Sequence, residues 1–142
     1  MKNAIKLFGC VALFFLMPTN VSAQQYSQKQ CSGVSTMRNI EFNGSSDVEE
    51  IKVEVSDDTE NMSLNVNGTI KSGYLTVEIY DPKGKKHGNF SIESQLKSSS
   101  KKKELVCGQM QKIIEDPMKG DWVVKLIPKD VSGEISICAM QN

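Results

Sequence analysis

A period-two alternation of apolar and polar residues, repeated in short segments, constrains the fold of this chain more than any other feature. In residues 51–55, 62–66 and 75–79, every second residue is apolar and the residues between are polar. Successive side chains of a β-strand point to opposite faces of a sheet, so each segment would have one dry and one wet face. The alternation therefore predicts half-buried antiparallel strands.

Turn chemistry separates these segments and sets their number. Residues 81–84 read Asp-Pro-Lys-Gly, in which proline presets its own φ for a turn and glycine tolerates the reversal that follows. Similar signals occupy residues 116–120 and 132–133. The stretches between turns predict about eight short strands, at residues 40–42, 51–55, 62–66, 74–80, 90–92, 104–115, 122–127 and 134–139. We expect an all-β protein, an antiparallel β-sandwich of the jelly-roll or immunoglobulin-like kind.

Residues 104–115 allow two interpretations. Val106, Met110 and Ile114 fit one face of a helix. However, Gly108 weakens a helix, and the lysines that precede the segment oppose the dipole at a helix N-terminus. We favour a strand and keep the helix as the alternative.

The first residues have the pattern of an export signal. Lys2 and Lys6 precede an apolar stretch at residues 7–17, and small residues end the segment. This stretch is too short to cross the hydrocarbon layer, which needs about 20 helical residues. We expect residues 1–23 to be a cleaved signal peptide and residues 24–142 to form a single domain. The mature protein would be secreted or periplasmic and would have no transmembrane segment.

The charge balance limits the classes of partner. Seventeen basic residues match seventeen acidic ones, whereas a general nucleic-acid binder is usually strongly basic. The lysines nevertheless gather in two loop segments, where they could contact an anionic polymer or an acidic partner; a solvated loop is the alternative. The candidate binding lysines are Lys83, Lys85, Lys86, Lys101, Lys102 and Lys103.

Aromatic residues give a second candidate contact surface. Tyr74 and Tyr80 fall on the same face of one predicted strand, so an exposed aromatic row could bind a glycan or a protein. The single tryptophan, Trp122, shares a strand face with Val124 and Leu126. We therefore expect Trp122 to anchor the core rather than to stack on a sugar ring.

The predicted mature chain holds three cysteines, Cys31, Cys107 and Cys138, in an oxidising compartment. Three pairings are possible, and each leaves one thiol over. We expect one disulfide, with buried apolar thiols as the alternative. His87 is the only histidine and lies in a predicted turn, so the sequence offers a cysteine nucleophile no well-placed base.

No cofactor or metal site is expected. One histidine and widely spaced cysteines match no zinc spacing. Asp57, Asp58 and Glu60 are weak calcium candidates, because Met62 stands where an EF-hand loop requires glycine. A solvated acidic turn is the favoured interpretation.

The order of strands and turns in the last half of the chain resembles a known class of domain. The residues that carry it are 73–85, Pro117, 120–126 and 133–137. This strand-and-turn pattern is similar to the jelly-roll sandwiches found beside secreted proteases, the pre-peptidase C-terminal and convertase P-domain class. Those modules are accessory, so the resemblance implies a binding or structural role and carries over no catalytic residue.

These observations together predict an exported, non-enzymatic binding or structural module of the cell envelope. Its partner would be an envelope or extracellular protein or glycan, and not a nucleic acid. The alternative is a secreted protease inhibitor or regulator that presents a lysine-rich loop. A hydrolase ranks last, because no nucleophile, base and orienting group can be assembled from the sequence.

Overall fold

The computed structural model describes residues 34–97, 99 and 101–142; the predicted signal peptide and Cys31 lie outside them. The described residues form six strands and no helix. None of them therefore forms a helix of the length and apolarity that crossing a membrane requires. The strands are β1 (Val34–Ser45), β2 (Glu49–Val55), β3 (Asn61–Tyr80), β4 (Lys86–Glu93), β5 (Val106–Glu115) and β6 (Gly120–Gln141).

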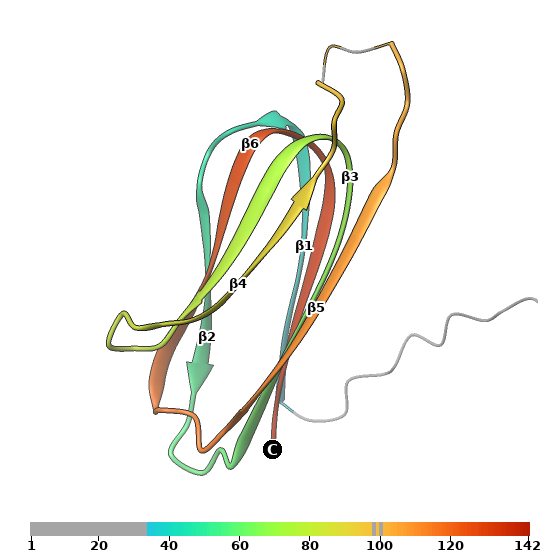
Figure 1. The fold of residues 1–142 in the computed structure, drawn as a ribbon. Coiled ribbons are helices and arrows are strands. Elements are labelled where there is room, and N and C mark those ends of the chain that lie inside the picture. The colour runs from blue at the N-terminus through green and yellow to red at the C-terminus, as the bar shows by residue number, and fades with distance from the viewer. Residues whose placement is uncertain (1–33, 98, 100) are drawn as a thin grey trace, which may run out of the picture.

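Two long strands, β3 and β6, form the centre of one antiparallel sheet. They pair with each other from Met62 opposite Gln141 to Tyr80 opposite Val123. On its other edge β3 pairs first with β5 and then with β4, while β6 pairs first with β2 and then with β1. Figure 1 shows both long strands rising along one side of the molecule, bending over at the same end and descending along the other side.

Bulges make this bend possible. The register of β3 against β6 shifts on both sides of Ser72. Gly73 and Gly133 have φ values of 81° and 153°, which residues other than glycine rarely adopt. The buried residues of β3 are even-numbered up to Ser72 and odd-numbered from Leu75 onward. A bulge that changes the parity keeps the apolar residues on one continuous face, which becomes the inside of the folded sheet.

The two halves of the sheet pack against each other across one core. A methyl group added at Gly108 of β5 would lie 2.6 Å from Cζ of Phe90 and 2.7 Å from Cγ1 of Ile92, both on β4. Gly108 thus leaves room for the β4 side chains that approach β5 across the core. The largest fully buried side chain is Trp122, which is 1% exposed, as predicted for a core anchor.

Six strands replace the predicted eight. Residues 62–66 and 75–79 belong to the single strand β3, and residues 122–127 and 134–139 belong to β6. The glycines between these segments bend the strands without ending their hydrogen-bonded pairing, so the sheet is continuous and not divided into two separate sheets. The strand interpretation of residues 104–115 is confirmed, because β5 spans most of that segment.

The fold gives the molecule two distinct ends. We call the end at which β3 and β6 fold over the bent end; it also carries the β1–β2 and β4–β5 connections. We call the opposite end the open end; it carries residues 56–60, 81–85 and 116–119 and the C-terminus.

Candidate functional site

A cavity of about 530 Å³ lies at the bent end, between the bend of β3 and the connection from β4 to β5. Most of the residues that line it are basic or hydroxyl-bearing, and one is an exposed leucine. They are Lys71, Ser72, Lys97, Lys102, Lys103, Glu104, Leu105 and Ser132.

Hydrogen bonds hold the base of the β4–β5 connection against β3. The Gly73 N–H donates to the Leu96 carbonyl at 3.1 Å, and the Ser94 N–H donates to the Gly73 carbonyl at 2.9 Å. Glu104 closes the connection at its other end, because its carboxylate accepts the Ser94 hydroxyl at 2.5 Å and the Gln95 N–H at 3.1 Å. The lysine-bearing segment therefore projects from a fixed base.

Three lysines around this cavity have positive charges that are available to a ligand. The ammonium groups of Lys71, Lys97 and Lys103 make no ion pair or hydrogen bond with any residue that the structure describes. The one carboxylate in the lining, that of Glu104, is engaged with Ser94 and Gln95. The cavity is thus a region of positive potential that attracts anions.

A second cavity, of about 470 Å³, continues from the first onto the outer face of β1, β6 and β3, and the two share Lys71, Leu105 and Ser132. In it Glu41 lies directly opposite Glu134 across the β1–β6 pair. Cross-strand neighbours have Cβ atoms about 5 Å apart, so two like charges face each other there. The basic cavity thus adjoins an acidic groove, with Lys71 between them.

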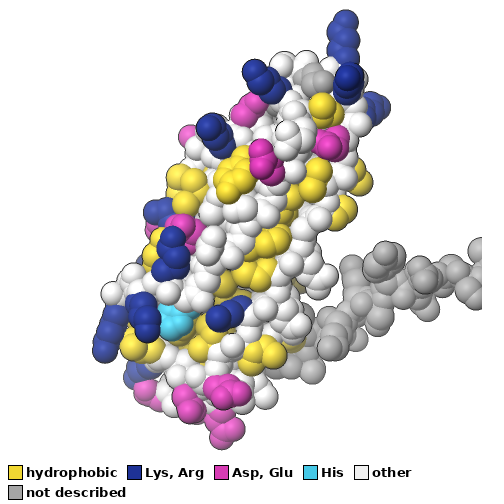
Figure 2. All heavy atoms as spheres, viewed as in Figure 1, with side chains coloured by type: hydrophobic (Ala, Val, Ile, Leu, Met, Phe, Trp, Pro, Cys, Tyr) yellow, Lys and Arg dark blue, Asp and Glu magenta, His cyan; other side chains and the backbone are white. Residues whose placement is uncertain are grey.

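The structure separates the predicted lysines into two groups. Lys102 and Lys103 line the cavity at the bent end, and exposed Lys101 precedes them. The other group, Lys83, Lys85 and Lys86, lies at the open end, with the length of β4 between the groups. The two loop segments therefore do not form one patch. Figure 2 shows basic side chains at the tip of the bent end and an acidic cluster at the opposite tip.

Sequence reasoning missed Lys71, Lys97, Leu105 and Ser132. Lys71 has no partner in either ladder of β3, because the register shifts between Ile70 and Ser72. Its side chain is therefore free to leave the period-two pattern and to line the cavity. The sequence signal for Lys71 was the triplet Lys-Ser-Gly at residues 71–73 between two alternating segments. It indicates that the alternation is interrupted, but it does not show that the interruption is a bulge.

The tyrosine face is only partly the exposed row that the sequence predicted. Tyr74 is 38% exposed, and its hydroxyl donates to the Ser91 hydroxyl at 2.9 Å. Tyr80 is half-buried, because its hydroxyl donates to Glu78 at 2.6 Å and the Lys86 ammonium lies 5.6 Å from its ring centroid.

Glu78 and Lys86 shift each other's pKa on this face. The ammonium group of Lys86 and the hydroxyl of Tyr80 both donate to the Glu78 carboxylate, and they lower its pKa. The same contact raises the pKa of Lys86. Tyr80 and Lys86 are therefore engaged with Glu78, which leaves Tyr74 as the open aromatic contact.

His87 takes part in a structural corner at the open end. Its Nε2 lies 2.9 Å from the buried carboxylate of Asp81, and its ring centroid lies 4.8 Å from that of Trp122. The other oxygen of Asp81 accepts the N–H groups of Lys83 and Lys85, both at 2.9 Å. The hydrogen bond from His87, and then those two N–H groups, lower the pKa of Asp81. This corner holds the turn in place and leaves the histidine far from Cys107 at the start of β5.

The weak calcium candidates lie in the β2–β3 connection and are engaged locally. Asp57 pairs with Lys119 at 2.5 Å, and Asp58 accepts the Ser56 hydroxyl at 2.5 Å, which lowers the pKa of Asp58. Over the described ranges, no group of three or more His, Cys, Asp or Glu side chains is placed to hold a metal ion.

The register of the sheet separates Cys107 from Cys138, and the two are not bonded to each other. Cys107 lies opposite Thr69 and Cys138 lies opposite Asn65, with β3 between them. Two strand spacings and four residues along the strand put their Cα atoms roughly 16 Å apart, against a limit of about 7 Å for a disulfide. The pairing of Cys107 with Cys138 is therefore wrong, and both remaining candidate pairings involve Cys31.

No protein-family model matches the chain. No curated protein matches it either. Among solved structures, the chain is similar to a protein of Bacillus endospore appendages, which are described as a novel family of disulfide-linked pili. The TM-score is 0.40 and the sequence identity 10%, over 75% of this chain and 84% of that one. A likeness at this level carries no inference about function.

Proposed function

We propose that this chain is a non-enzymatic binding or structural module exported to the cell envelope, and that it binds acidic groups of an envelope glycan or protein at the bent end. One observation carries the proposal: the cavity of about 530 Å³ is ringed by lysines, three of which have no ion-pair partner in the described part of the chain. Unpaired cations beside a concave surface favour an anionic ligand.

The folded sheet supports this role as a scaffold. Its interior is mainly hydrocarbon, and the residues that contact a partner would all lie on its surface. We also propose that the folded sheet is a jelly-roll or immunoglobulin-like sandwich. It would resemble the accessory modules of secreted proteases. Tyr74 would supply a second contact on the outer face of β3.

Binding of a defined acidic polysaccharide tests the proposal. Polygalacturonate is the probe, neutral dextran is its control, and affinity is measured by calorimetry at low and at physiological salt. We expect polygalacturonate alone to bind, and Lys71→Glu with Lys103→Glu to weaken binding by at least about ten-fold, because two reversed charges repel the polymer.

A matched pair of lysines gives the control for this experiment. Lys83→Glu with Lys85→Glu makes the same change of charge at the open end, away from the cavity. It should leave the affinity within about two-fold, since the effect of a distant exposed charge is screened. Equal losses in both double variants, or equal binding of dextran, would refute a site at the bent end.

One observation favours the alternative, a protease inhibitor that presents Lys101, Lys102 and Lys103. The connection that carries them is fixed at its base by Glu104 and Ser94, as an inhibitor loop must be held before cleavage. Incubation with a trypsin-like protease distinguishes the two: lasting inhibition with slow cleavage at one lysine supports the inhibitor, and rapid digestion of the loop excludes it.

A further inference from the structure

We infer that the bent end docks on an anionic lipid surface, with its lysines on the headgroups and Leu105 inserted between them. The inference goes beyond the proposed function, because it gives the same lysines a partner of another class, a lipid surface. Charge, geometry and exposed apolar surface at the bent end support it independently of one another.

Charge on the β4–β5 connection is predominantly positive. It carries four lysines, Lys97, Lys101, Lys102 and Lys103, against one carboxylate, that of Glu104, which is engaged with Ser94 and Gln95. Lys71 and Lys129 lie at the same end of the molecule, together with the carboxylates of Glu41, Asp47, Glu93, Asp130 and Glu134. Lysines that are clustered within a Debye length of an anionic membrane add to its attraction one by one.

Three lysines on the outer face of the other half-sheet are paired instead. Lys52 lies 3.3 Å from Asp121, Lys125 lies 3.2 Å from Glu50, and Lys86 pairs with Glu78. The charges of each pair cancel at a distance, so these lysines do not attract an anionic surface to that face. The lysine cluster of the β4–β5 connection therefore favours an approach with the bent end toward such a surface.

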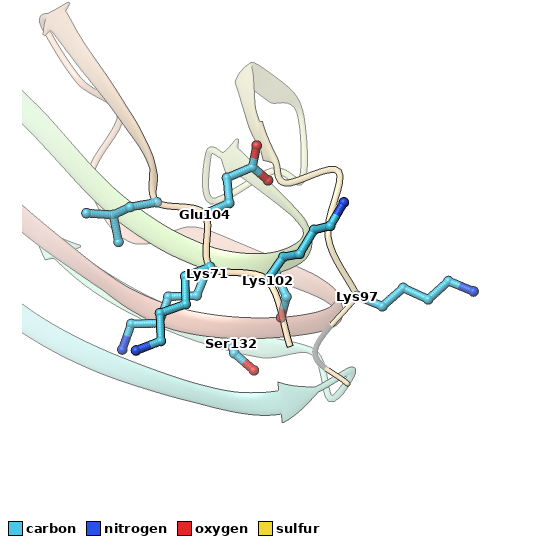
Figure 3. A pocket seen from close by; sticks show the side chains of 8 residues that line it. Lys71, Lys97, Lys102, Glu104 and Ser132 are labelled. Atoms are coloured by element: carbon cyan, nitrogen blue, oxygen red, sulfur yellow. The ribbon is translucent and has the colours of Figure 1, made fainter. Parts of the chain in front are cut away.

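The lysines do not converge on a single point. Figure 3 shows the side chains of Lys71, Lys97 and Lys102 extending in different directions from the rim of the cavity. Figure 1 shows the connection between β4 and β5 projecting beyond the bends of β3 and β6. A small anion is held by groups that point at it, whereas diverging cations on a projecting segment suit an extended array of negative headgroups.

Exposed apolar side chains accompany the lysines. Leu105 lies two residues after the lysine run, beyond Glu104, and is 64% exposed, and Val48 in the β1–β2 connection is 51% exposed. The Ser46 hydroxyl accepts the Asp130 N–H and the Ser132 hydroxyl accepts the Gly44 N–H, both at 3.0 Å, and these bonds fix the β1–β2 side to β6 at the same end. Stable attachment to a membrane takes two signals, and a polybasic patch together with inserted apolar groups supplies both.

The base of the projecting connection is already ordered, so docking would not have to fix it. Gly73, Ser94 and Glu104 hold its two ends to β3 through the hydrogen bonds described above. A segment presented in this way loses less conformational entropy on binding than a free one. The fixed base also keeps Leu105 beside the lysines, so both would meet the same headgroups.

Vesicle binding tests the inference. The purified chain is sedimented with vesicles of phosphatidylcholine alone or with about one third phosphatidylglycerol, and the bound fraction is measured against lipid concentration. We expect binding to the anionic vesicles only. Lys101→Gln with Lys103→Gln should weaken it by about 25-fold, at roughly five-fold for each lysine, and added salt should weaken it further.

Leu105→Ser tests the insertion. It should weaken vesicle binding by roughly ten-fold, because the lipid offers an apolar phase that the serine cannot enter favourably. Ile113→Ser is the matched control: Ile113 is 62% exposed but lies on β5 toward the open end, so its loss should leave vesicle binding unchanged. Lys83→Gln with Lys85→Gln is the corresponding lysine control.

The outcomes separate this inference from the proposed function. No binding to anionic vesicles, or binding that Leu105→Ser leaves intact, overturns the lipid inference, and lysine-dependent binding of polygalacturonate would then leave the proposed function standing. Failure of the lysine variants to affect either ligand overturns both. Circular dichroism and thermal midpoints confirm that each variant is folded, which is expected because every substituted side chain is exposed.

Discussion

Gly133 and Gly44 both have positive φ but differ in their surroundings. A methyl group at Gly133 would lie 2.7 Å from the Ile70 Cα and closer still to the Thr69 carbonyl, whereas nothing lies within 4 Å of one at Gly44. We expect Gly44→Ala to cost about 1 kcal/mol of backbone strain. Gly133→Ala should cost about 3 kcal/mol or more, because two central strands must also move apart. Urea denaturation measures the free energy of unfolding of both variants. Equal losses would mean that β3 and β6 can move apart at the bend without further cost.

Asp81 should make the stability of the fold depend on pH. Its pKa is lowered in the folded state, first by the hydrogen bond with His87 and then by the N–H groups of Lys85 and Lys83. A lowered pKa stabilises the folded state above the pKa of the unfolded chain, near 4, and the contribution is lost as the pH falls through the folded value. We expect wild type to be more stable than Asp81→Asn at pH 7.

The difference in the free energy of unfolding between wild type and Asp81→Asn should shrink steadily as the pH falls below about 4. Urea denaturation between pH 2 and pH 7 measures it. A constant difference across this range would mean that the charge of Asp81 does not contribute to stability. Trp122, which contacts His87 and is buried, provides the fluorescence signal for unfolding.

At the scale of the strand, alternation was sufficient to predict which residues face the core. The apolar positions of residues 51–55, 62–66 and 75–79 are all buried. The sequence did not show that Gly73 and Gly133 bend strands, since glycine with positive φ serves a reversal and a bulge equally well. Only the long-range pairing of β3 with β6 distinguishes them, and no local signal encodes it.

The same limit applies to the candidate site. Composition was enough to indicate Lys102 and Lys103, which are half of a lysine ring around the cavity. Lys71 and Lys97 join them through the bulge in β3 and the hydrogen bonds of Gly73 with the β4–β5 connection. Residues about thirty positions apart in sequence become neighbours only when the sheet folds over.

Strand β5 lies at an edge of the sheet, and we expect Lys112 to prevent that edge from pairing with a strand of another chain. β5 pairs with β3 on one side, and no described strand pairs with its other side. Lys112 is half-buried in the inward row with Met110 and Ile114. A charge that points inward at an edge opposes pairing with a second chain, because pairing would bury it.

Lys112→Val should therefore increase self-association, measured by size-exclusion chromatography with light scattering over a range of concentrations. Lys125→Val is the matched control, because β6 is covered by β2 on one side of Lys125 and by β3 on the other. We expect the control to remain monomeric. Equal association of the two variants would show that added hydrophobicity, and not the open edge, is responsible.

For the molecule as a whole, the register of the sheet limits the covalent links that can form. Cys107 on β5 and Cys138 on β6 are separated by the full width of β3. Within residues 24–142, the predicted mature chain, one bond can join Cys31 to only one of them, so at least one of these three thiols cannot be paired there. In an oxidising compartment this thiol is open to modification or to a bond between chains.

Thiol counting in denaturant checks this constraint. If Cys31 forms the expected disulfide, the wild-type monomer should show one free thiol, and Cys31→Ser should show two, because the two remaining cysteines are too far apart to bridge without separating β3 from β5 or β6. Ellman's reagent gives the count, and non-reducing electrophoresis separates monomers from cross-linked chains. A Cys31→Ser monomer with no free thiol would contain the Cys107 to Cys138 bond, which would rule out the strand order of the central sheet.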